Sequence, residues 1–99
     1  MTECEVRLDG VTTPEECFRR FFEATAGVVP DYGGRNLDAV HDDLGDIDAP
    51  LTLIFTEVDQ AADALGRWFD RFVGMLAASI KRSGNLLTIV LRGTTPGET

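Results

Sequence analysis

The chain has 99 residues, 43% of them hydrophobic, which is enough for one domain with a modest core. Its 17 acidic residues outnumber its 9 basic ones and give a formal net charge of −8. That balance argues against nucleic-acid binding, which requires a basic surface. No run approaches the roughly 20 apolar residues of a membrane span, and no signal segment is recognisable. We therefore expect a cytoplasmic protein that binds neither nucleic acid nor membrane. The acidic balance indicates a basic or cationic partner, or merely serves solubility.

Residues 4–8 alternate between apolar and polar side chains, which predicts a strand with one covered face. A helix is expected to begin at Thr13 and Pro14, because threonine is a favoured cap and proline suits the first helical position. Glu16 would complete a capping box with Thr13. The apolar stripe that follows, closed by Gly27, indicates that this helix packs on the core.

A second, short helix is expected after Asn36, a favoured N-cap, and before Gly45. Residues 51–55 then form a short apolar run, a pattern typical of a strand that is covered on both faces. A third helix through about Leu65 is separated by Gly66 from a strongly amphipathic fourth, which ends near Gly84. Residues 86–91 are again nearly all apolar and predict the last strand.

Helices that lie between strands permit parallel pairing. The predicted fold class is therefore α/β, a three-stranded parallel sheet packed with about four helices, with right-handed crossovers assumed. The sequence does not determine the order of the strands. We expect residues 1–92 to form a single domain and residues 93–99 a flexible C-terminal tail.

Catalytic chemistry finds little support in the sequence. His41 is the only histidine, and a metal-dependent hydrolase that uses Asp38, His41 and Asp42 is one hypothesis. The spacing of these residues matches no established ligand pattern. Cys4 and Cys17 are too few for a disulfide framework and have no evident basic neighbour to activate them. We therefore expect a non-enzyme with no cofactor and no metal.

The acid is concentrated in residues 31–48, where six aspartates and one base, Arg35, give a local net charge of −5. Asp38 and Asp42 are four residues apart, so they stack on one side of the expected helix, away from its apolar side. A solvated acidic face is the simpler interpretation, although like charges at this spacing are mildly destabilising. The aspartates of this acidic patch are Asp31, Asp38, Asp42, Asp43, Asp46 and Asp48.

A dense acidic patch with Tyr32 at its edge would suit docking on a basic cleft. Carboxylates accept paired hydrogen bonds from arginine, and tyrosine supplies a rigid anchor. A cleft that binds phosphate presents cationic side chains, which two carboxylates on a rigid helix can also occupy. The patch therefore predicts an inhibitor of a phosphate-handling enzyme, most simply a nuclease.

Over about residues 3–91 the sequence resembles the barstar family of ribonuclease inhibitors. The matching residues are Tyr32-x-Gly34-x-Asn36-Leu37-Asp38-Ala39-x-x-Asp42-x-Leu44, followed by Pro50-Leu51 and an apolar strand. The resemblance implies a barstar-like domain that forms a 1:1 complex with a secreted microbial ribonuclease of the guanyl-preferring type. The helix and the loop before it would enter the active site of that enzyme.

The same resemblance implies roles for individual residues. Asp42 would be the main phosphate mimic, Asp38 would pair with a further arginine, and Tyr32 would pack on the catalytic histidine. Gly34 and Asn36 would shape the loop. The predicted partner-binding residues are Tyr32, Gly34, Asn36, Asp38, His41, Asp42, Gly45 and Asp46.

The sequence departs from the best-known pattern of this family at three places. His41 replaces a tryptophan, Ser79 stands where a glutamate makes an outlying contact, and Asp46 and Ile47 lie near a second expected tryptophan. These departures bear on which ribonuclease is the target. An immunity-type binding module against another basic toxin is the alternative function that the sequence leaves open.

Overall fold

A computed structural model describes residues 2–93, which form three strands and four helices. The predicted C-terminal tail lies, apart from Gly93, outside the described residues. In chain order the elements are β1 (Thr2–Arg7), α1 (Pro14–Thr25), α2 (Leu37–Gly45), β2 (Leu51–Thr56), α3 (Val58–Leu65), α4 (Arg67–Arg82) and β3 (Leu87–Leu91). The order of elements is the one that the sequence predicts.

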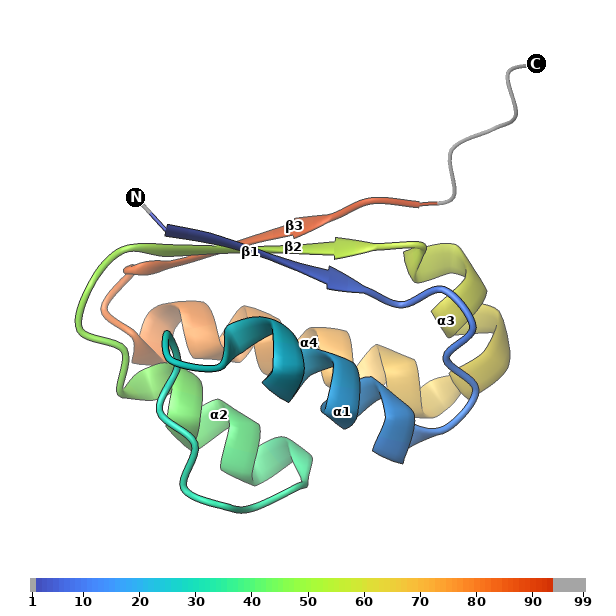
Figure 1. Cartoon of the computed structure of the whole chain (residues 1–99), viewed down its shortest axis with the longest axis horizontal. Helices are drawn as coiled ribbons and strands as arrows, with labels where there is room; N and C mark the ends of the chain where they lie inside the picture. Colours follow the sequence, from blue (N-terminus) through green and yellow to red (C-terminus); the bar gives the residue numbers. More distant parts are fainter. Residues whose placement is uncertain (1, 94–99) are drawn as a thin grey trace.

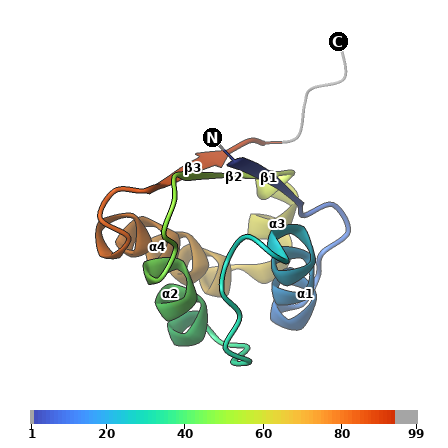
Figure 2. The same cartoon turned by 60° about the vertical axis from the view of Figure 1, so that its left-hand side comes forward.

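The three strands pair in parallel in the order β1-β2-β3, so that Thr2 lies opposite Leu51 and Leu51 opposite Leu87. All four described helices lie on one face of this sheet (Figures 1 and 2). Both crossovers step in the same direction along the sheet, and crossovers of one hand then place their helices on the same side. The predicted three-stranded parallel sheet with four helices is confirmed.

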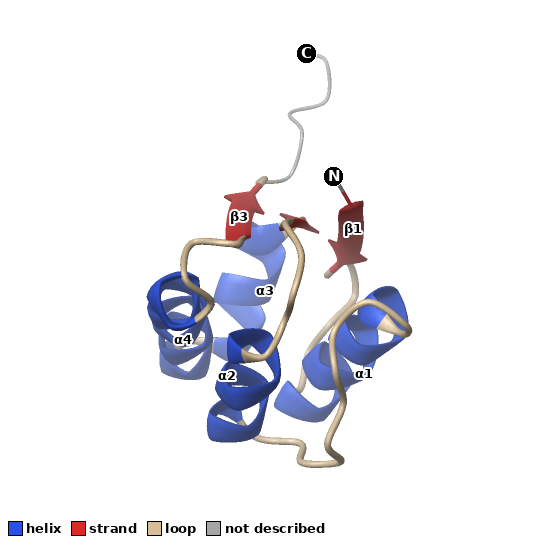
Figure 3. Ribbon diagram, turned by 90° about the vertical axis from the view of Figure 1, so that its left-hand side faces the viewer, coloured by secondary structure: helices blue, strands red, loops and turns tan. Residues whose placement is uncertain are grey.

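The prediction that residues 51–55 are covered on both faces is wrong. Ile54 and its neighbour Val90 are only half-buried on the face opposite the helices, and no helix among residues 2–93 covers them. Figure 3 shows the sheet as the outermost layer, with the helices stacked beneath it. The central strand β2 and the edge strand β3 are both mostly apolar, so an apolar run does not by itself indicate that both faces of a strand are covered.

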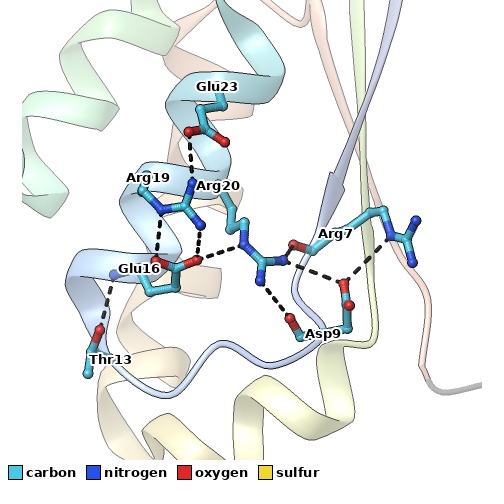
Figure 4. A network of polar contacts seen from close by, with 7 residues as sticks. All are labelled: Arg7, Asp9, Thr13, Glu16, Arg19, Arg20 and Glu23. Carbon is cyan, nitrogen blue, oxygen red and sulfur yellow. Dashed lines mark hydrogen bonds and ion pairs between the residues drawn. The ribbon is translucent and has the colours of Figure 1, made fainter.

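The start of α1 is capped as the sequence predicts, because the Thr13 hydroxyl accepts a hydrogen bond from the backbone N–H of Glu16 at 3.1 Å. The Glu16 carboxylate, in contrast, binds the guanidinium groups of Arg19 and Arg20 (Figure 4). These hydrogen bonds lower the pKa of Glu16 to about 2. Glu16 therefore stabilises α1 mainly through its side-chain ion pairs.

Arg20 also ties α1 to the end of β1. Its guanidinium donates to the backbone carbonyl of Arg7 at 2.7 Å and to that of Asp9 at 2.8 Å (Figure 4). Two carbonyls at the exit of the edge strand are thereby satisfied by one side chain from the helix. This contact sets where α1 lies beneath the sheet.

The core lies between the sheet and the helices. Phe72 of α4 is fully buried and contacts the rings of Phe55, Trp68 and Phe69. Cys17 is buried, and burial raises the pKa of its thiol to about 12, so it packs as a small apolar residue. Within residues 2–93 no helix is long and apolar enough to span a membrane.

Candidate partner-binding surface

The helix α2 displays one side to solvent because its other side is locked into the core. Val40 and Leu44 are fully buried, and Leu37 packs against the core at its edge. The helix begins where predicted, since Asn36 Oδ1 accepts a hydrogen bond from the backbone N–H of Ala39 at 2.8 Å. Such a cap satisfies a backbone donor that the helix itself cannot pair.

The loop before α2 is held in shape by Asp31 and Arg35. The Asp31 carboxylate accepts from the backbone N–H of Gly33 and from the Arg35 guanidinium, each at 2.9 Å. These bonds lower the pKa of Asp31, and the bond with Arg35 has the larger effect. Arg35 in turn lies over the ring of Phe22 in α1, with its guanidinium carbon 3.8 Å from the ring centre. The loop before α2 is thus also attached to α1, through Arg35.

Two glycines allow the loop before α2 to adopt its conformation. Gly33 has a φ of +98°, which side chains with a Cβ rarely adopt. At Gly34 a Cβ would lie only 2.5 Å from the Cβ of Ala39, so a side chain there would push the loop away from the first turn of α2. The close approach of loop and helix therefore requires a glycine at position 34.

Tyr32 joins the loop to the far end of α2. Its side chain is 67% exposed, yet its hydroxyl donates a hydrogen bond to Asp46 Oδ2 at 2.9 Å. This bond, together with the negative charge of Asp46, raises the pKa of Tyr32. The ring is held at one end only, and the remainder of it is free to contact another molecule.

The predicted phosphate mimics Asp38 and Asp42 are both exposed on α2. Asp42 forms an ion pair with Arg82 at the end of α4, with Oδ1 3.3 Å from the guanidinium nitrogen. The Arg82 side chain lies across Gly45, where a Cβ would come within 2.5 Å of Arg82 Nε and within 2.7 Å of its Cδ and Cγ. His41 is half-buried at the side of the helix.

Asp43 is not part of the exposed acidic patch, which corrects the sequence-based interpretation. Its side chain is 1% exposed, and its Oδ2 has no hydrogen-bond partner among residues 2–93. The carboxylate accepts a hydrogen bond from the backbone N–H of Tyr32, but burial dominates and raises its pKa. Asp43 thus holds the loop before α2 from the protein interior, and the burial of its carboxylate costs folding free energy.

The family model described as "Barstar (barnase inhibitor)" matches residues 1–92, nearly the whole chain. The chain belongs to the barstar family. The resemblance found in the sequence and the barstar-like fold are thereby confirmed. No curated protein matches the chain significantly.

The eight residues predicted to bind a partner can now be located in this barstar-family fold. The structure places all of them in one continuous segment, made of the loop before α2, the helix and the residue after it. It brings the Tyr32 hydroxyl to Asp46, the Arg82 guanidinium to Asp42 and the Arg82 stem to Gly45. Their part in binding a partner stays a prediction.

Ser79, the position at which the resemblance implied an outlying contact, does not lie on the surface of α4. It is fully buried, and its hydroxyl donates to the Met75 carbonyl at 2.8 Å within α4. The residue of α4 that reaches the acidic side of α2 is instead Arg82, a cation that sequence reasoning missed. No sequence signal reveals that contact, because it depends on how α2 and α4 pack.

The hypothesis of a metal-dependent site at Asp38, His41 and Asp42 gains no support from the geometry. Among residues 2–93, no group of three or more histidine, cysteine or acidic side chains is arranged to hold a metal ion. The groups that gather on this surface include carboxylates, the Tyr32 ring and the guanidinium groups of Arg35 and Arg82. Their chemistry is that of ion pairing and ring stacking with another molecule.

Proposed function

We propose that this chain is a stoichiometric inhibitor of a secreted microbial ribonuclease of the guanyl-preferring type, bound 1:1. The loop before α2 and the exposed side of α2 would fill the active site of the enzyme. The observation that carries this proposal is the display of Asp38 and Asp42 on a helix whose inner side is fixed by fully buried Val40 and Leu44. The family description as a barnase inhibitor supports the same target class.

The chemistry of the surface suits a cleft that binds phosphate. Such a cleft concentrates arginine, lysine and histidine, and each can bind a carboxylate as it would a phosphate oxygen. Asp42 takes the central position in this proposal, and Asp38 pairs with a neighbouring cation. The formal net charge of −8 would speed association with a basic enzyme and make it sensitive to salt.

Tyr32 is proposed as the apolar anchor of the complex. Its ring is 67% exposed, and the hydroxyl is already paired with Asp46, so the ring can stack on an imidazole without loss of a hydrogen bond. A side chain that is held before binding loses less conformational freedom when the complex forms. In this proposal the protein acts in the cytoplasm of the cell that makes the ribonuclease, and protects its RNA.

Titration into a barnase activity assay tests this function. Inhibition should be complete at one equivalent. Asp42→Ala should weaken it by about 30-fold or more, and Asp38→Ala by less, because a cation in the cleft loses its partner. Asp48→Ala removes an exposed aspartate outside the predicted set and serves as the matched control.

Two results would count against the proposal. One is the absence of inhibition from barnase and from a panel of microbial guanyl-preferring ribonucleases. The other is that the Asp42→Ala and Asp38→Ala proteins inhibit as strongly as the Asp48→Ala protein does. That result would place the contact elsewhere on the molecule.

A further inference from the structure

The carboxylate proposed as the central phosphate mimic is already engaged by a cation of its own chain. Asp42 Oδ1 lies 3.3 Å from the Arg82 guanidinium, and the two side chains keep 62% and 49% of their surfaces exposed. The pair therefore lies on the outer surface, where a partner can reach both groups. Any cation from a target that approaches Asp42 meets Arg82 at the same place.

The position of Arg82 is favoured by its surroundings. It is the last residue of α4, a helix that packs against α2, and a cation there is favoured by the helix dipole. Its methylene stem occupies the space that a side chain at Gly45 would need. The absence of a side chain at position 45 thus lets the guanidinium reach Asp42 across the end of α2.

We propose that Arg82 is a specificity-determining residue that competes with the target for Asp42. This inference rests on the proposed inhibitory function. A target that offers a single cation merely exchanges one ion pair for another, and its cation is left beside the displaced guanidinium. A target whose cleft brings several cations to Asp42 gains enough attraction to overcome both effects. Arg82 thereby restricts the inhibitor to enzymes with a clustered cationic site.

Inhibition constants against barnase at low and physiological salt test this competition. Arg82→Gln should tighten inhibition about three- to tenfold, because a competing exposed ion pair and a like charge are both removed. Arg82→Lys, which keeps the charge, should stay within about twofold of wild type. Lys81→Gln is the matched control, since it removes the same charge from the neighbouring exposed position on α4 and should change inhibition less than twofold.

A double-mutant cycle separates competition for Asp42 from a general effect of charge. In the Asp42→Ala background, Arg82→Gln should no longer tighten inhibition more than Lys81→Gln does. Thermal unfolding of each variant shows whether a change in inhibition follows from altered stability, which is not expected for an exposed pair.

Failure of this inference is distinguishable from failure of the proposed function. If wild type inhibits barnase and Asp42→Ala weakens it, but Arg82→Gln acts no differently from Lys81→Gln, Arg82 has no role in specificity. Competition for Asp42 is also ruled out if the Arg82→Gln effect persists undiminished in the Asp42→Ala background. If neither wild type nor Arg82→Gln inhibits any ribonuclease of the panel, the proposed function fails and this inference with it.

Discussion

Replacing the buried Asp43 by asparagine should stabilise the protein at neutral pH. The carboxylate is 1% exposed, one of its oxygens is unpaired, and the group that it satisfies is the backbone N–H of Tyr32. Asparagine Oδ1 can still accept from that N–H. The change therefore replaces an unpaired charged oxygen with an unpaired neutral amide, and leaving the charged group unpaired costs more.

The expected gain in the free energy of unfolding is about 1 kcal/mol at pH 7, the lower end of what an unsatisfied buried group costs. For a domain of this size, 1 kcal/mol corresponds to a rise in Tm of about 4–8 °C. Urea unfolding of wild type and Asp43→Asn measures the difference. Asp48→Asn makes the same change in net charge at an exposed site and serves as the control.

The gain should depend on pH in a defined direction. Burial raises the pKa of Asp43 above its ordinary value of 3.8, so the folded protein binds this proton more readily than the unfolded chain does. The cost of the buried charge is therefore fully present at neutral pH and diminishes as the pH falls through the raised pKa. An Asp43→Asn protein no more stable than Asp48→Asn at pH 7, or a gain that does not shrink on acidification, would refute this reasoning.

Two further predictions concern α1 and the loop before α2. Because its ion pairs lower the pKa of Glu16 to about 2, from 4.5, Glu16 should stabilise the fold above about pH 4.5 and lose this effect as the pH falls toward 2. Wild type should then lose more stability than Glu16→Gln between pH 5 and about 2.5 in thermal melts; parallel losses would contradict this. Gly34→Ala should weaken barnase inhibition more than it lowers Tm, because its Cβ would meet Ala39 at 2.5 Å and displace the loop; unchanged inhibition would show that the loop shape is not required.

The sequence predicted the parallel sheet, the four helices and the Asn36 cap, because each depends on local spacing or capping chemistry. It did not predict that the helices cover one face only. Strands at 51–56 and 87–91 are apolar enough for burial on both faces. Which face the helices cover depends on the direction in which the crossovers step along the sheet, and no local sequence pattern encodes that direction. The strand order was undetermined for the same reason.

Within the candidate site, the sequence placed the carboxylates of α2 but misjudged Asp43. At 100° per residue, position 43 lies beside the apolar stripe of Val40 and Leu44. The helical spacing therefore indicated burial at this position, but the charge of an aspartate suggested an exposed side chain. Arg82 lies 40 residues beyond Asp42 in the chain, and only the packing of α4 against α2 brings the two together. Contacts of that kind require the tertiary structure.

The inner and outer sides of α2 together explain why a mostly acidic surface can be rigid. Repulsion among exposed carboxylates tends to loosen a helix of only nine residues. Burial of Val40 and Leu44, the Asn36 cap and the Arg82 ion pair each oppose that tendency. Of these, the ion pair is the one that engages Asp42, the carboxylate proposed as the central phosphate mimic. In the proposed complex, the contact that holds Asp42 before binding must be weakened for the target to bind, so the ion pair that restrains the surface is also the one proposed to make it selective.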